Sequence, residues 1–288
     1  MSVFFCDSNC ELWHSTVEDL GVRFISMPYA FGDQESGYDL GKTHDFKGFY
    51  TRLRNGEMPT TMALNPHNYI DIFEPVFASG EDIIYVAFSS AMSGTFQFMR
   101  QAVDELLQKY PDRKFTYADT LNISVGAGLI VYEAAKLHNA GASDDEIVEF
   151  VDSFKNQVAI YFTANDLMHL KRGGRISATS AIFGTALGIK PVLTVSKEGK
   201  VVALDKVMGR KKAMQSLLKR IENEGSELDK FPIWILHADC ENDARVLEER
   251  VRVIAGDNAN IIVQAIGPTI GTHCGPDTLG LIFHKTSK

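Results

Sequence analysis

Several features are scarce in this 288-residue chain, and each scarcity excludes a class of protein. It has only four cysteines, too few for a disulfide framework in a chain of this length. Cys6 and Cys10 have a CxxxC spacing, but no matching pair follows at the spacing of a zinc site. The sequence therefore predicts no structural disulfides and no metal site.

Long apolar runs are also missing. No window holds about eighteen uninterrupted apolar residues, so no integral membrane segment is expected. The first residues lack the basic and apolar regions of a secretory signal, which favours a soluble, cytoplasmic protein. Positive charge is in deficit as well, with 29 Lys and Arg against 37 Asp and Glu and a net charge of -8. Such a surface repels phosphate backbones, so no nucleic acid partner is expected.

Hydrophobic residues make up 45% of the chain, enough for a sizeable core. In the first half, apolar runs at residues 3–6, 82–88 and 115–118 alternate with stretches of helical periodicity. This alternation predicts a parallel sheet with helices on both faces. Residues 23–27 are expected to form a further strand, ended by Pro28.

The second half has a different pattern. A hairpin is predicted at residues 191–204, and two later strands at 232–237 and 260–265 are separated by helices. A helix of small residues is expected at 177–187. The fold class is therefore α/β, with an N-terminal α/β domain over residues 1–157 and a C-terminal α/β domain over residues 158–288.

Ser93-Gly94-Thr95 stands between a predicted buried strand and a predicted helix. Ligands of parallel sheets bind at the carboxyl ends of the strands, and a helix N-terminus there suits an anion. The Ser93 hydroxyl would add a hydrogen bond. The alternative, that Ser93 only caps the helix, is about equally well supported by the spacing.

Two glycine-containing segments are further candidates. Residues 170–176 are basic and contain Gly173-Gly174, which would suit a phosphate or carboxylate but also a simple sharp turn. Residues 266–276 hold three glycines and two prolines, which predict a rigid loop. His273 inside this loop is expected to donate a hydrogen bond.

These segments resemble, in order along the chain, the motifs of the DegV family, whose members include the fatty-acid-binding subunits of bacterial fatty acid kinase. The matching segments are Asp7-Ser8, Pro59-x-Thr61 with Asn65-Pro66, Ser89-Ser90-x-x-Ser93-Gly94-Thr95-Phe96, Asp119-Thr120 with Ser124, Gly126 and Gly128, Leu167-x-x-Leu170-x-x-Gly173-Gly174-Arg175-Ile176, Lys190-Pro191, and Gly267-Pro268 to Gly275-Pro276. Two positions depart from the pattern: Met62-Ala63 replaces the usual Ser-Gln, and Asp277 replaces a usual Gly.

The resemblance implies two α/β domains, the first with a parallel sheet and the second with a mixed sheet, and a ligand between them. It also implies a carrier that performs no chemistry and needs no cofactor. Such a carrier holds a long-chain fatty acid and presents it to the catalytic subunit of a fatty acid kinase. Thr61 and Ser93, with Gly94 and Thr95 beside it, take the carboxylate-binding places, and His273 lies at the same head group.

Two other functions stay open from the residues alone. A serine hydrolase or acyltransferase would use Ser93 as nucleophile and His273 as base, although the chain has no Gly-x-Ser-x-Gly elbow. A lipid-binding regulator would need no kinase. For the acyl tail, the apolar and small side chains between Ile176 and Ile189 are expected either to line a tunnel or simply to pack closely. Arg175 and Arg210 are candidates for the surface that faces a kinase.

Overall fold

The computed structural model describes residues 2–165, 167–176 and 188–286. The chain divides into two compact units. The first comprises Met1–His44 and Thr61–Lys155, and the second comprises Asp45–Thr60 and Asn156–Lys288. The segment Asp45–Thr60 thus belongs with the second half of the chain, although it lies between two segments of the first unit.

The first unit is built on a four-stranded sheet in the order β2-β1-β6-β7, in which all neighbours are parallel. Its strands are β1 (Val3–Asp7), β2 (Arg23–Ile25), β6 (Ile83–Ala87) and β7 (Phe115–Asp119). Its helices are α1 (His14–Asp19), α3 (Pro66–Ala78), α4 (Thr95–Lys109), α5 (Val125–Asn139) and α6 (Asp144–Phe154). The parallel sheet predicted from the alternation of apolar runs and helical stretches is confirmed.

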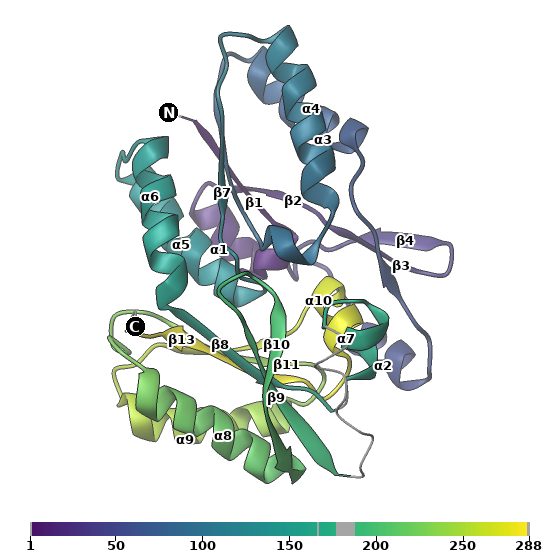
Figure 1. The fold of residues 1–288 in the computed structure, drawn as a ribbon, viewed down its shortest axis with the longest axis vertical. Coiled ribbons are helices and arrows are strands. Elements are labelled where there is room, and N and C mark those ends of the chain that lie inside the picture. The colour runs from purple at the N-terminus through teal and green to yellow at the C-terminus, as the bar shows by residue number, and fades with distance from the viewer. Residues whose placement is uncertain (1, 166, 177–187, 287–288) are drawn as a thin grey trace. The chain divides into compact units, whose positions relative to one another are not determined.

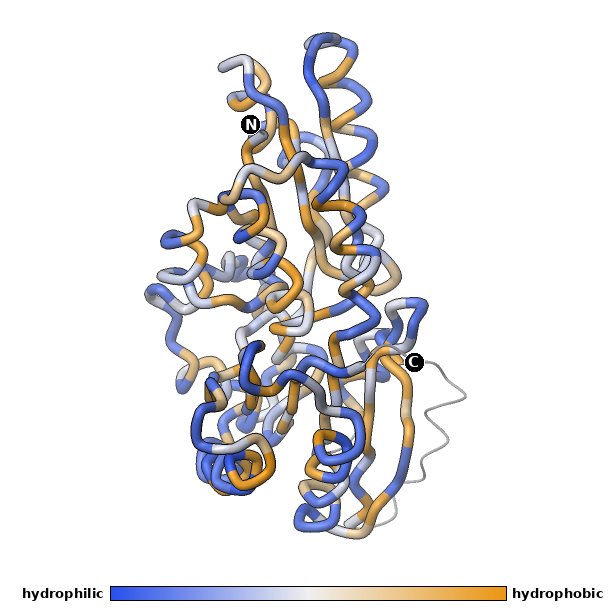
Figure 2. Tube along the Cα trace, turned by 90° about the vertical axis from the view of Figure 1, so that its left-hand side faces the viewer, coloured by the Kyte–Doolittle hydropathy of each residue, from blue (hydrophilic) through white to orange (hydrophobic). Residues whose placement is uncertain are grey.

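Successive side chains of a strand point to opposite faces, and both faces of this sheet are covered. Phe5 of β1 packs with the aromatic side chains of α3, with its ring 5.4 Å from that of Phe73. Its neighbour Phe4 points the other way and contacts His138 of α5, also at 5.4 Å between ring centroids. Figure 1 shows α3 and α4 together on one side of this sheet and α5 on the other. Figure 2 shows orange and blue residues alternating along the helices, as expected for helices with one buried face.

A small three-stranded sheet was not foreseen. It has the order β4-β3-β5 and consists of β3 (Pro28–Phe31), β4 (Gln34–Gly37) and β5 (Thr60–Thr61). The strand expected at residues 23–27 is present as β2, but it ends at Ile25, two residues early, and Pro28 begins β3. A proline is tolerated as the first residue of a strand, where its missing N–H breaks no interior ladder bond.

The second unit contains a six-stranded mixed sheet in the order β10-β9-β8-β13-β11-β12. Its strands are β8 (Val158–Thr163), β9 (Ile189–Val195), β10 (Val201–Met208), β11 (Ile233–His237), β12 (Ile261–Ala265) and β13 (Leu279–His284). Strands β9 and β10 form the predicted hairpin, and β11 and β12 are parallel. The last strand, β13, was missed by the sequence prediction, yet it lies in the middle of the sheet, antiparallel to both β8 and β11.

The second unit also holds α2 (Phe46–Arg54), α7 (Met168–Arg172), α8 (Gly209–Glu224), α9 (Glu241–Ala255) and α10 (Pro268–Cys274). Helices α8 and α9 lie side by side on one face of the mixed sheet (Figure 1), where Leu217, Leu247 and Leu281 share one apolar core. The rigid loop predicted over residues 266–276 is wrong, because most of it is helix α10. Pro268 stands at the first turn, where its missing N–H costs nothing, and Gly275 ends the helix with a φ of 73°.

The helix of small residues predicted at 177–187, with most of the side chains expected to line a tunnel, lies outside the described residues. Within the part of the chain that the structure describes, no helix is both long enough and apolar enough to cross a membrane. Among the same residues, no group of three or more His, Cys, Asp or Glu side chains is arranged to hold a metal ion.

Candidate ligand-binding site

The turn between β6 and α4 brings Ser93, Gly94 and Thr95 together at the carboxyl end of a central parallel strand. Ser93 has extended backbone angles, Gly94 is the N-cap residue, and α4 begins at Thr95. The Ser93 hydroxyl oxygen accepts a hydrogen bond from the Thr95 N–H at 3.2 Å. Ser93 therefore does satisfy one N–H of the helix, and its own hydroxyl proton has no acceptor among the described hydrogen bonds.

Gly94 leaves open space beside the start of α4. Its backbone has ordinary right-handed helical angles, and an added β-carbon would meet no heavy atom closer than the Gln97 side-chain nitrogen at 4.0 Å. Neither the backbone conformation nor packing against the described residues therefore requires glycine here. Gly94 is also the N-cap residue of a fifteen-residue helix, and the dipole at a helix N-terminus favours a carboxylate.

Thr95 connects this turn to the segment that carries Thr61. Its side chain is buried, and its hydroxyl lies 2.8 Å from the hydroxyl of Tyr69 on α3 and 3.5 Å from the Leu64 carbonyl oxygen. Thr61 itself is half-buried in β5, three residues before Leu64. Its neighbour Met62 donates its backbone N–H to the Pro28 carbonyl at 3.2 Å, which fixes the path of this segment in the first unit.

His273 belongs to the second unit, where it lies on α10 with its ring against α7. A β-carbon on Gly173 would clash with Nδ1 of His273, and one on Gly275 would clash with the ring of His169. Each glycine therefore makes room for a histidine of the other helix. The Gly-Gly and Gly-Pro motifs found in the sequence serve this close approach of α7 and α10.

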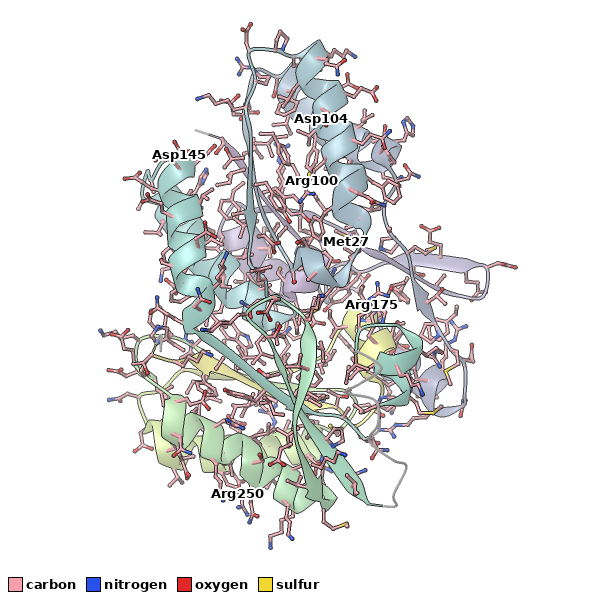
Figure 3. All side chains as sticks on the ribbon, in the orientation of Figure 1. Met27, Arg100, Asp104, Asp145, Arg175 and Arg250 are labelled. Atoms are coloured by element: carbon pink, nitrogen blue, oxygen red, sulfur yellow. The ribbon has the colours of Figure 1, made fainter. Side chains whose placement is uncertain are left out.

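Burial and nearby arginines together determine the charge of His273. Burial, together with the positive charges of Arg175 and Arg172, lowers the pKa of His273 to about 4. The imidazole is therefore neutral at pH 7 and offers one N–H donor rather than a positive charge. Figure 3 labels Arg175 beside α7 and α10; its guanidinium donates to the Gly173 carbonyl, and burial lowers its pKa. Any positive charge offered to an anion here comes from the arginines.

Asp277 stands where the family motif usually has glycine, and the structure explains this replacement. This residue has a φ of 62°, a left-handed conformation in which glycine is the least strained residue. Aspartate also tolerates it better than most residues, and its carboxylate pairs with Arg54 of α2 at 2.7 Å. Arg54 contacts Asp239 at the same distance, so one guanidinium joins α2 to two loops of the sheet.

Sequence reasoning found the Ser93 turn but not the residues that hold it. Ser90 and Leu121 donate their backbone N–H groups to Asp119, at 3.3 and 2.9 Å, and Phe88 donates to Asp7 at 3.1 Å. Both aspartates were noted only as motif letters. Each side chain also accepts an N–H from the segment that follows β6, more than twenty residues away in the sequence, so only knowledge of which strands are neighbours would have found this role.

The nucleophile geometry of a serine hydrolase is not present in the described part of the first unit. The described hydrogen bonds of the Ser93 side chain include none to a histidine or a carboxylate, and the one they do include is accepted from the Thr95 N–H. An activated serine needs a base within hydrogen-bond reach and a third group that orients the base.

The fold defines a class: α/β proteins of two units, with a serine- and glycine-containing turn after a central parallel strand of the first unit. The chain belongs to the DegV family, whose model, described as an uncharacterised protein family, matches residues 3–286. A DegV domain-containing protein of Clostridium perfringens is 38% identical over 286 residues, covering 99% of this chain and 98% of the relative.

Solved structures show the same fold. A DegV family protein from Thermus thermophilus, described as binding fatty acid, is 26% identical, with a TM-score of 0.86 over 99% of this chain and 100% of that one. A DegV lipid-binding protein from Thermotoga maritima is 24% identical, with a TM-score of 0.84 and complete coverage of both chains. At that identity the second match speaks for the fold alone.

Proposed function

We propose that this protein binds one long-chain fatty acid and holds its carboxylate at Thr61 and at the turn formed by Ser93, Gly94 and Thr95. The observation that carries the proposal is the full-length match to the fatty-acid-binding DegV protein of Thermus thermophilus. The open space at Gly94 beside the N-terminus of α4 supports it, because a buried carboxylate needs several hydrogen-bond donors. The family resemblance adds His273 to this set, and its neutral ring offers one N–H donor.

The acyl tail would supply most of the affinity. Each buried methylene contributes roughly 0.8 kcal/mol, so a long chain outweighs the cost of removing the carboxylate from water when that carboxylate is hydrogen-bonded. The protein acts in this proposal as a carrier, not an enzyme, and needs no cofactor.

We further propose that the loaded protein presents the carboxylate to the catalytic subunit of a fatty acid kinase, which forms an acyl phosphate. The arginines beside His273 support this step, because guanidinium groups are suited to a transferring phosphoryl group. A regulator that binds lipid without a kinase would share every feature of the head-group turn. Capture of the kinase subunit by loaded but not by delipidated protein separates the two.

The test of fatty-acid binding starts with purified protein. It is examined by native mass spectrometry and then, after denaturation and extraction, by lipid mass spectrometry. One acyl chain per protein is expected. A protein without a stoichiometric acyl chain that also fails to take up added oleate would disprove the proposal.

The head-group residues are tested by substitution. Ser93→Ala and Thr61→Ala each remove a hydrogen bond to a charged group, worth roughly 1.5–3 kcal/mol, so each should weaken retention by about tenfold or more. Ser90→Ala in the same turn and Thr60→Ala in the same strand are matched controls that should retain the ligand. Unchanged retention in the double variant Ser93→Ala/Thr61→Ala would place the carboxylate elsewhere.

A further inference from the structure

Asp7 is a completely buried carboxyl group at the carboxyl end of β1. One oxygen accepts the N–H of Asn9 at 3.0 Å. The other accepts the hydroxyl of Tyr85 at 3.0 Å and the N–H of Phe88 at 3.1 Å. Phe88 is the first residue after β6, so Asp7 holds the start of the turn that leads to Ser93.

The same turn is fixed from its other side by β7 and the loop that follows it. Asp119 accepts the N–H of Ser90, and the Ser89 N–H donates to the Asn122 carbonyl at 2.7 Å. The turn therefore has little freedom to move away from Asp7. A ligand bound at its far end would lie at a distance from Asp7 that the backbone sets.

Among the described residues, the groups that act on Asp7 carry no positive charge. The structure places around it the phenols of Tyr69, Tyr85 and Tyr117, the carboxylate of Asp119 and the thiol of Cys6. No cation makes an ion pair with it within the described residues. Burial raises the pKa of Asp7 to about 7 in spite of its three hydrogen bonds, and the charge of Asp119 adds to the increase.

Asp7 and the proposed head-group turn lie at the same edge of the sheet, because β1 and β6 are parallel neighbours and both segments stand at the carboxyl ends of these strands. Burial and the charge of Asp7 both raise the pKa of Tyr69, whose hydroxyl is bonded to the Thr95 hydroxyl. A carboxylate placed at Ser93 and Thr95 would be close to the same negative charge in surroundings of low polarity. Two like charges in such a site favour the neutral form of whichever group is protonated more easily.

We propose that Asp7 takes up one proton from solvent when a carboxylate binds at the Ser93–Thr95 turn, so that affinity for the anion falls as the pH rises through neutrality. The inference rests on the proposed function, because it needs an anionic head group at this turn. The proton moves onto a carboxyl oxygen of Asp7, and the total charge of the buried site stays constant. Linkage then requires that loss of this proton weakens binding.

The test compares wild type with Asp7→Asn, which keeps the shape of the side chain and cannot ionise. Binding of the fluorescent fatty acid cis-parinaric acid is measured from about pH 6 to about pH 8.5, a range that spans the titration. Because the ligand titrates equally in both experiments, the ratio of the two affinities isolates Asp7. This ratio, wild type over variant, should fall by at least about threefold over the range.

Calorimetry of wild type in two buffers with different ionisation enthalpies should show net proton uptake, and the variant should take up fewer protons. Asp119→Asn is the matched control, because it also removes a charged hydrogen-bond acceptor from the turn but leaves Asp7 in place. The ratio of its affinity to that of Asp7→Asn should still depend on pH. If Asp7→Asn does not fold, Tyr85→Phe is used. Loss of its donor disfavours ionised Asp7 and should move the midpoint of the pH profile upward.

A ratio that stays constant while both proteins bind would overturn this inference and leave fatty-acid binding intact. An unchanged midpoint in a Tyr85→Phe variant that still binds would overturn it as well. Failure of both wild type and Asp7→Asn to bind at any pH would instead refute the proposed function, and the inference with it.

Discussion

His273 of α10 lies so close to Gly173, the C-cap residue of α7, that no other residue fits at position 173 without movement. The two residues are a hundred positions apart, and both helices have fewer than eight residues. The contact therefore depends on the packing of two short elements rather than on the stability of either helix. It also fixes the ring that the family resemblance places at the ligand head group.

Gly173→Ala is expected to displace the His273 ring and to destabilise the protein by roughly 1–3 kcal/mol, the usual cost of overpacking. Denaturant unfolding measures the loss, and the ring resonances of His273 report the displacement. Gly94→Ala is the matched control, because open space surrounds that position and its stability should change by less than about 0.5 kcal/mol. Equal stability of Gly173→Ala and wild type would contradict the close contact.

Gly94→Ala makes a second prediction, about function. The added methyl group enters the open space beside the N-cap of α4, where we propose that the carboxylate lies. Fatty-acid retention should therefore fall by about tenfold or more, while unfolding free energy stays near that of wild type. A variant that is stable and retains the ligand fully would show that the head group does not use this space.

His273 predicts a pH dependence of stability. Its pKa in the folded protein is about 4, below the ordinary value of 6.5, so the unfolded chain binds a proton more readily. Stability contributed by the neutral ring is full above about pH 6.5 and is lost as the pH falls towards about 4, by up to roughly 3 kcal/mol. The measurement is thermal unfolding of wild type and His273→Asn over this range.

The His273→Asn variant should lose less stability than wild type on acidification, because the group that resists protonation is gone. Parallel curves for the two proteins would contradict the assignment. Asp7 acts with the opposite sign, since its raised pKa makes its contribution fall as the pH rises from about 4 to about 7. Asp7→Asn should therefore become relatively more stable than wild type as the pH rises over that range.

Gly128 gives a prediction for the first unit. A β-carbon there would clash with the backbone carbonyl of Cys10, which cannot rotate away as a side chain can. Gly128→Ala should destabilise the protein by at least about 1–3 kcal/mol, despite the better helix propensity of alanine. Chemical denaturation measures the loss. A stabilised variant would mean that α5 does not approach the segment after β1 so closely.

Arg54 and Asp277 invite a double-mutant cycle with Arg54→Gln and Asp277→Asn. Their ion pair is about two-fifths exposed, with side-chain exposures of 40% and 36%, so screening by water keeps the coupling small. A coupling of about 0.5–1 kcal/mol is expected, because the guanidinium also bonds Asp239 and is held in place. If the losses of stability in the two single variants simply add up in the double variant, the ion pair does not explain why aspartate stands at position 277.

The sequence by itself determined the local elements. Asn65-Pro66 and the Ser143/Glu146 pair begin helices through side-chain caps that reach only three residues, and both capping boxes are present. The apolar run through Ile83 and Val86 predicts a buried central strand, because every residue in it avoids water. Short-range signals of this kind need no knowledge of the rest of the chain.

Tertiary structure decided what long-range packing controls. Strand β13 inserts between β8 and β11, and the sequence carries no signal for this strand order. Gly267-Pro268 begins a helix rather than a loop, because Pro at the first turn of a helix looks the same in the sequence as Pro in a turn. Asp7 acquires its role from a β-strand seventy-eight residues away, through Tyr85. The charge of a carboxyl group depends on the burial and donors around it, and those exist only once the chain has folded.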